Sequence, residues 1–295
     1  MLLGLVGMVP GIFLFDWLAH LGGSGRLIGF AVALAYFGVL NSSLGRGQTV
    51  GKRIMKIEVV DKFGRHIGIG RSFARYAVLG IPFFLNGAPL PTDLLSSWVG
   101  YGVGVIVFGS LGATIYLYAF NRRTRQSLHD LAVGTFVVRA DSIGEAPKTS
   151  IWRPHIVVSA ALCLLPLVFV AFVPTIMTMS AFPDLLALQQ KLQATGKVHS
   201  VSVYVGKNWS SINGASHETS SLQATAIWKQ RPGDYQAAAG EIAAVMLANY
   251  PDVQKKDVVV VTVVYGYDIG IASAWRKESA QHTPQEWAGI VAGKK

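Results

Sequence analysis

An acidic side chain within an apolar stretch is the first feature of this chain that could do chemistry. Asp16 interrupts the apolar run of residues 2–21. A carboxylate is costly in hydrocarbon, so it is expected to exchange a proton or a cation there, or to pair with a polar group of another helix. The sequence leaves both readings open: an ion-transport site at Asp16, or a structural hydrogen bond to Asn41 or Ser42.

A second group of charges lies in the basic stretch Gly45–Arg53, which reads GRGQTVGKR. It is not a phosphate-binding loop, because Arg46 stands where that motif has its first Gly, and Lys52 is followed by Arg53 instead of Ser or Thr. Lys52 and Arg53 are therefore expected to mark membrane topology, to contact anionic lipid headgroups or to pair with a carboxylate.

The third candidate is the pair His129-Asp130, which we expect to form an ion pair or a helix cap, because no further metal ligand lies at helical spacing. The single cysteine, Cys163, excludes a disulfide framework and a cysteine-based zinc site. No nucleophile with a neighbouring base stands out, so the sequence predicts no enzyme, no catalytic residue, no metal and no cofactor.

Asp16 belongs to the first of five apolar runs, which we interpret as membrane-spanning helices. Only 14% of the residues are charged, against roughly a quarter in a typical soluble domain. Gly22–Gly25 is the expected turn between the first two runs, and Pro82 is expected to bend the third. Gly100, Gly104 and Gly112 are expected to let another helix approach the fourth closely. The runs cover residues 2–21, 26–44, 74–91, 98–120 and 156–179.

The basic residues predict the orientation in the membrane. Residues 1–180 hold 15 Lys and Arg against 7 Asp and Glu, and apart from Arg26 all the basic residues lie in segments 46–75 and 122–153. Short loops rich in Lys and Arg face the cytoplasm and its anionic headgroups. Five crossings then give a cytoplasmic N-terminus and an extracytoplasmic C-terminal domain. The pattern does not predict nucleic-acid binding.

The composition divides the chain into three parts. Residues 1–148 hold four spans and two basic cytoplasmic segments, 149–180 hold the fifth span, and 181–295 form an extracytoplasmic α+β domain. The predicted fold is an α-helical transmembrane bundle of about five spans with this domain appended. Hydrophobic periodicity predicts strands near 54–60, 67–69, 201–205, 219–229 and 258–264, and helices near 183–194 and 234–250 and from 284.

The two cytoplasmic segments resemble each other, which suggests two parallel helix-hairpin repeats, with chance similarity as the alternative. If the repeat is real, Lys52 or Arg53 could pair with Asp130 beneath the helices. The aligned positions, without a gap, are Gln48 and Gln126, Thr49 and Ser127, Lys52 and Asp130, and Val59-Val60 and Val137-Val138.

The peptides GRGQTVGKR, IEVVD and SLHDLAVGTFVV together resemble the RDD family of bacterial membrane proteins over about residues 10–140. The family is named for one Arg and two Asp. The resemblance implies that Asp16 is the first Asp and Asp130 the second, whereas residues 1–15 contain no Arg for the family's position near the start of the first helix. It implies an inner-membrane location and a suspected role in moving ligands.

Two functions follow as hypotheses. The first is a membrane protein that moves or gates a small ion or solute, with Asp16 as the titrating group and Asn41, Lys52, Arg53 and Asp130 as further transport or structural candidates. The second is an anchor or assembly factor whose C-terminal domain binds a partner protein. Assembly into a homo-oligomer is compatible with either hypothesis.

Overall fold

The computed structural model describes residues 11–88, 97–142, 150–177, 182–212 and 215–293. The chain forms two compact units. The helical unit comprises Arg26–Phe172 with Ile269–Ile271, and the sheet unit comprises Met1–Gly25, Val173–Asp268 and Ala272–Lys295. The N-terminal residues thus group with the C-terminal domain, whereas the composition had suggested boundaries near residues 148 and 180.

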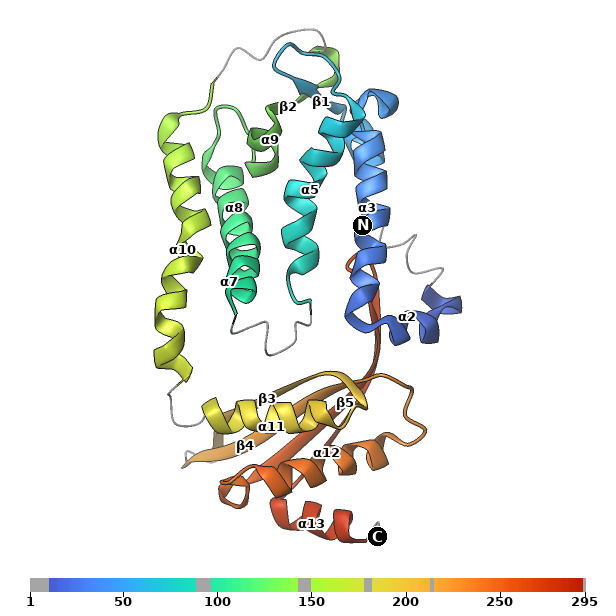
Figure 1. Ribbon diagram of the computed structural model, residues 1–295, viewed down its shortest axis with the longest axis vertical. Helices are drawn as coiled ribbons and strands as arrows, with labels where there is room; N and C mark the ends of the chain where they lie inside the picture. Colours follow the sequence, from blue (N-terminus) through green and yellow to red (C-terminus); the bar gives the residue numbers. More distant parts are fainter. Residues whose placement is uncertain (1–10, 89–96, 143–149, 178–181, 213–214, 294–295) are drawn as a thin grey trace. The chain divides into compact units, whose positions relative to one another are not determined.

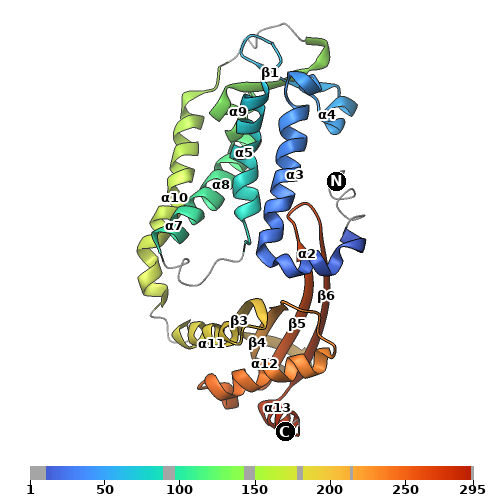
Figure 2. The same ribbon diagram turned by 45° about the vertical axis from the view of Figure 1, so that its right-hand side comes forward.

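The helical unit is built from apolar helices that lie alongside one another in both ribbon views (Figures 1 and 2). Two stretches, Phe15–Leu40 and Trp98–Phe120, are long and apolar enough to cross a membrane. The second coincides with the predicted fourth span. The predicted first span lies partly outside the described residues. The helices are α3 (Gly25–Leu40), α5 (Ile69–Leu85), α7 (Trp98–Gly104), α8 (Ser110–Phe120) and α10 (Arg153–Met177).

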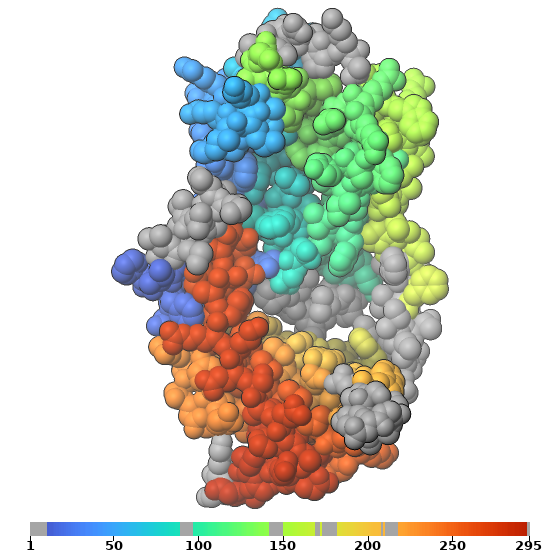
Figure 3. Space-filling model, turned by 180° about the vertical axis from the view of Figure 1, so that it is seen from behind, coloured from blue at the N-terminus to red at the C-terminus, as the bar shows by residue number. Residues whose placement is uncertain are grey.

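Large apolar side chains of these helices are left exposed. Leu27 is 70% exposed, Ile115 67% and Val157 68%, and side chains of α8 and α10 form the green and yellow-green surface in Figure 3. A protein that folds in water buries most such surface, whereas lipid chains accept it without cost. The exposure of these helices therefore suits a bilayer.

The close helix contact in the fourth apolar run lies at Gly109, within a π-helical turn, Val105–Gly109 (η3). A Cβ on Gly109 would fall 2.5 Å from the carbonyl oxygen of Cys163 in α10, so only glycine fits there. The expectation for Gly104 and Gly112 was wrong, because a Cβ at either would meet no atom within 4 Å. The π-turn changes which face of the helix meets its neighbour.

The two basic segments meet in a small antiparallel sheet of β1 (Ile57–Asp61) and β2 (Thr135–Arg139). A short helix precedes each strand: α4 (Val50–Ile54) and α9 (Leu128–Val133). The predicted second strand at 67–69 was wrong, because α5 already begins at Ile69. The Asp61 carboxylate accepts the backbone N–H groups of Phe63 and Arg65, and the resulting turn leaves one isolated bridge between Val60 and His66.

The backbone repeats between these two segments in the predicted alignment. Gln48 Nε2 donates to the carbonyl of Ile57 (3.2 Å), and its counterpart Gln126 donates to that of Thr135 (2.8 Å). Val59 lies opposite its own counterpart, Val137, so the strand pair is centred on a local two-fold axis. The left-handed backbone positions also coincide: Gly47 (φ 66°) with Arg125 (φ 53°), and Lys56 (φ 53°) with Gly134 (φ 65°).

The sheet unit is an α+β domain, as predicted, with its four strands in the order β3-β4-β5-β6 (Figure 2). The pairings are antiparallel except for β4 with β5, which are parallel because α12 crosses between them. Asp234 caps α12 as expected, accepting the N–H groups of Gln236 and Ala237. The elements are α11 (Phe182–Ala194), β3 (Val198–Ile212), β4 (Ala215–Trp228), α12 (Tyr235–Asn249), β5 (Val258–Asp268), β6 (Ser273–His282) and α13 (Pro284–Ala292).

One face of this sheet carries the core. Alternate residues of β5, Val259, Val261 and Val263, are fully buried against the helices, as period-two alternation requires. Each such side chain stabilises the fold by roughly 1.5–3 kcal/mol. The short helix α2 (Phe15–Leu21) belongs to the same unit, where the Phe15 ring lies 5.8 Å from that of Tyr265 in β5.

Candidate functional site

A buried ion pair joins the two cytoplasmic segments to α5. Arg75, on α5, donates from Nη2 to Oδ1 of Asp130 at 2.7 Å and from Nε to the same oxygen at 2.9 Å. Arg75 is 6% exposed and Asp130 3%. Thr135 Oγ1 donates to this oxygen as well (2.9 Å). One carboxylate oxygen thus receives three donors in a dry environment, where removing any one charge leaves the other uncompensated.

Asp130 also caps its own helix, as the sequence suggested. Its second oxygen, Oδ2, accepts the backbone N–H of Ser127 (3.4 Å) and the Ser127 hydroxyl (3.3 Å). Burial alone would raise the pKa of Asp130, but the charge of Arg75 and the hydrogen bonds from Arg75 and Thr135 outweigh it and lower the pKa. Asp130 is therefore ionised across the physiological range.

The geometry fixes the protonation state of His129. Arg75 Nη2 lies 3.0 Å from His129 Nε2, and since arginine can only donate, Nε2 must accept. The ring proton then sits on Nδ1, which lies 2.8 Å from the Ser127 hydroxyl. Burial, with smaller effects from the charges of Arg75 and Lys52, lowers the pKa of His129 to about 4 against the pull of Asp130. His129 is neutral at pH 7.

A second arginine holds the other end of α9. Arg71, one turn before Arg75 on α5, donates from Nε to the carbonyl of Val133 (2.6 Å) and from Nη2 to that of Gly134 (2.7 Å). These are carbonyls at the helix C-terminus, which a cation satisfies best. Arg71 and Arg75 together clamp α9 along α5.

Lys52 is the group of this site that titrates near neutral pH. It lies half-buried on α4 and donates from Nζ to Oδ1 of Asn41, itself 2% exposed. Burial, and then the charge of Arg75, lowers the pKa of Lys52 to about 7, although Asp130 acts in the opposite direction. Lys52 thus gains or loses its charge close to a buried ion pair.

The predicted site residues separate into two groups. Asn41, Lys52 and Asp130 belong to this cluster, whereas Arg53 is exposed on α4. The predicted pairing of Lys52 or Arg53 with Asp130 was wrong, since Arg75 supplies the ion pair. The sequence did hold a signal for Arg75: like Asp16, it is an ionisable residue inside a predicted span, 74–91, and such residues are functional candidates.

Asp16 has a different partner from the one expected. It is exposed, and its Oδ1 accepts the hydroxyl of Tyr265 at 2.9 Å, within the sheet unit. Burial and this hydrogen bond raise the pKa of Tyr265 to about 12. Within the helical unit, the Ser42 hydroxyl donates to the carbonyl of Val39 (2.7 Å).

The described residues contain no group of three or more His, Cys, Asp or Glu side chains that could hold a metal ion. In comparisons with known proteins, neither the curated proteins nor the solved structures give a match. The model of the RDD family matches residues 1–134, which include α5, both short helices and Asp130. This match bears out the resemblance of residues 1–134 to the RDD family, which is membrane-associated, and together with the two long apolar helices it is consistent with a membrane location.

Proposed function

We propose that the RDD-like domain moves or gates a small ion or solute across the bacterial inner membrane, and that the cluster of Asn41, Lys52, Arg75, His129 and Asp130 changes its charge in the process. The carrying observation is Lys52, a half-buried amine with a pKa of about 7, beside a buried ion pair. Buried ionisable groups are costly, and their titration is the usual way in which proton binding is coupled to a change of shape.

The charge balance supports this role. Arg75 and Asp130 compensate each other and His129 is neutral, so the net charge of the cluster is set by Lys52. Protonated Lys52 adds a cation, which the Arg75 guanidinium repels and whose hydrogen bond Asn41 Oδ1 accepts. A passing cation would therefore be repelled by protonated Lys52 and would meet less repulsion from the neutral amine.

We propose the topology that the basic loops predict: five crossings, a cytoplasmic N-terminus and both basic segments inside. The sheet unit would then lie in the periplasm or outside the cell. No catalytic step and no cofactor form part of this proposal. In this proposal Asp16 is not the titrating group, because its carboxylate accepts a hydrogen bond from the hydroxyl of Tyr265.

Flux into proteoliposomes tests the proposal. Proton-coupled uptake of Na⁺, K⁺ and Li⁺ is measured for the wild type, Lys52→Met and Asp16→Asn. We expect Lys52→Met to abolish the pH dependence of flux and Asp16→Asn to retain it. Arg53→Met is the matched control, since it removes a neighbouring but exposed charge on the same helix. Tight, inactive vesicles with all three cations would overturn the transport role.

A second candidate is an anchor whose extracytoplasmic domain binds a partner protein. The supporting observation is a row of hydroxyl residues in register across all four strands, Ser202, Thr225, Thr262 and Ser279, on the face opposite the core. Thr262 Oγ1 and Ser279 Oγ lie 2.8 Å apart. On this reading, deleting residues 181–295 removes function, whereas Lys52→Met and Asp16→Asn leave it intact.

A further inference from the structure

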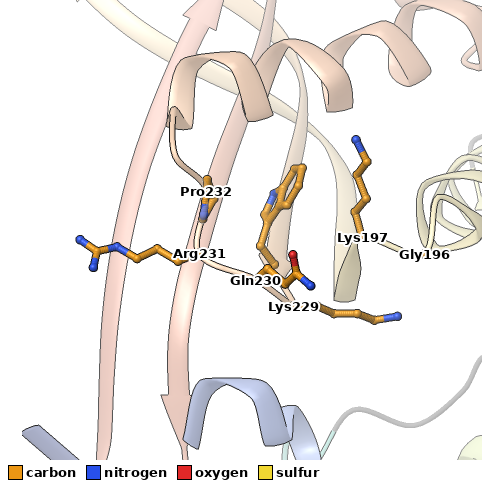
Figure 4. A pocket seen from close by; sticks show the side chains of 7 residues that line it. Gly196, Lys197, Lys229, Gln230, Arg231 and Pro232 are labelled. Atoms are coloured by element: carbon orange, nitrogen blue, oxygen red, sulfur yellow. The ribbon is translucent and has the colours of Figure 1, made fainter. Parts of the chain in front are cut away.

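A pocket of about 380 Å³ opens in the sheet unit where β4 ends and the chain turns towards α12 (Figure 4). Its walls come from the turn before β3 and the loop after β4. The backbone N–H of Lys229 donates to the carbonyl of Lys197 (2.9 Å), which extends the strand pairing and holds the two walls together. The pocket is thus framed by backbone hydrogen bonds as well as by side chains.

The pocket is lined by three cations and no carboxylate: Lys197, Lys229 and Arg231. Lys197 is paired with Glu241 (2.6 Å), whereas neither Lys229 nor Arg231 forms an ion pair within the described residues. Figure 4 shows Lys197 and Lys229 extending on one side and Arg231 on the other. A negatively charged ligand in the pocket would compensate part of this positive charge, and phosphate suits the role because it accepts several hydrogen bonds at once.

Trp228 supplies a second, independent indication of a ligand. It lines the pocket and is 9% exposed, and its Nε1 is buried without a hydrogen-bond partner within the described residues. An unpaired buried donor is costly, so native sites seldom leave one without a ligand or water oxygen. The pocket therefore has an unsatisfied donor as well as unpaired positive charge.

The surroundings of the pocket indicate where the phosphate comes from. His199, next in β3, lies 3.1 Å by Nε2 from the carbonyl oxygen of Ala19, and so ties this corner of the sheet to α2. Burial lowers the pKa of His199, the hydrogen bond to Ala19 acts in the opposite direction, and the charges of Lys229 and His20 lower the pKa further. The α2 helix exposes Trp17 (54%) and opens the apolar stretch Phe15–Leu40. Exposed tryptophan next to an apolar stretch is typical of the headgroup region.

We propose that this pocket binds the phosphate headgroup of an anionic phospholipid and so fixes the sheet unit at the membrane surface. The basic residues supply the charge, Trp228 lies in the pocket wall, and α2 supplies the apolar approach for the acyl chains. This role does not depend on the transport proposed above, because none of its residues belongs to the Lys52 cluster.

Native mass spectrometry of the full chain in detergent tests the proposal, with phosphatidylglycerol titrated as the probe. We expect Lys229→Gln/Arg231→Gln to bind the lipid roughly thirtyfold more weakly at its tightest site, since each of the two cations contributes about 1 kcal/mol near a charged surface. Lys191→Gln/Lys277→Gln is the matched control, as it removes two exposed charges of the same unit that do not line the pocket, and it should bind as the wild type does.

Two further arms separate the possible sources of phosphate. Phosphatidylcholine should bind the wild type no more tightly than it binds the pocket variant, because its headgroup carries no net charge. Inorganic phosphate should compete only weakly with phosphatidylglycerol. Equal phosphatidylglycerol binding by the wild type and the pocket variant would overturn the proposal. Tight binding of inorganic phosphate without retention of the lipid would overturn the membrane source.

Discussion

The two cytoplasmic segments have the same backbone and opposite chemistry. Residues 47–61 and 125–139 share a helix–strand succession, a glutamine that binds the strand, and left-handed positions at both ends of the short helix. At the third residue of that helix, however, one segment has Lys52 and the other Asp130. A repeated scaffold thus places a base and an acid on either side of a local two-fold axis.

The difference shows how a repeat becomes a site. A symmetric pair would put two carboxylates or two amines near each other, and like charges in a dry environment exclude one another. The opposite charges allow Arg75 to pair fully with Asp130 while Lys52 is left half-buried with Asn41. Backbone equivalence sets the positions, and side-chain difference makes one half permanently charged and the other titratable.

Among substitutions in the two segments, replacing Asp130 should have the largest effect on the free energy of unfolding. Asp130→Asn leaves the Arg75 guanidinium buried without its counter-charge, and we expect the free energy of unfolding to fall by roughly 3–5 kcal/mol. Reversible unfolding in mixed detergent micelles measures the loss. The double variant Arg75→Leu/Asp130→Leu is the control, and it should lose much less than Asp130→Asn alone. A loss below about 1 kcal/mol for Asp130→Asn would contradict a buried pair.

Lys52 should titrate at a lower pH than an exposed lysine does. Competitive acetylation, followed by mass spectrometry as a function of pH, should give Lys52 a midpoint near pH 7, against ~10.4 for an exposed lysine. Because the charged form is disfavoured in the fold, stability falls as the pH drops from about 10 to 7 and is level below that. In Arg75→Gln the midpoint should rise, since the Arg75 charge lowers the pKa of Lys52. A midpoint near 10 in the wild type would remove Lys52 as the titrating group.

Much of the fold follows from periodicity and loop chemistry. The run 98–120, the α+β domain and the cap at Asp234 were predictable, because apolar length, alternation and capping act over short stretches. The alignment of the two segments could also be predicted, because residues at equivalent sequence positions form the glutamine hydrogen bonds and the strand pairing. These features are determined by residues that are close together in the sequence.

The partners of the charged residues were not predictable in the same way. Arg75 is one of several basic residues near the same loop, and only the packing of α5 on α9 selects it for Asp130 over Lys52 or Arg53. The partner of Asp16, Tyr265, is far along the chain and belongs to a domain of different composition. Glycine spacing failed at Gly104 and Gly112, because the close approach to α10 occurs at Gly109, within a π-turn.

The shared glutamine offers a smaller test of the same comparison. Gln126→Ala should lower the free energy of unfolding by roughly 1–3 kcal/mol, because Gln126 is buried and its loss leaves the Thr135 carbonyl unsatisfied. Gln48→Ala should cost less, since Gln48 is only half-buried and water can replace its longer bond to Ile57. The same detergent unfolding assay compares the two. Equal losses would mean that the segments are equivalent in energy as well as in backbone.

The left-handed position after each short helix should respond in opposite directions in the two segments. Gly134→Ala places a Cβ at φ 65° and should destabilise by about 1 kcal/mol, whereas Lys56→Gly removes one at φ 53° and should be neutral or stabilising by up to that amount. Lys56 is exposed, so little packing is lost with its side chain. If both variants destabilise equally, the Lys56 side chain contributes something beyond its backbone angle. The two segments would then have the same backbone conformation at this position but would differ in what the residue there contributes to the free energy of unfolding.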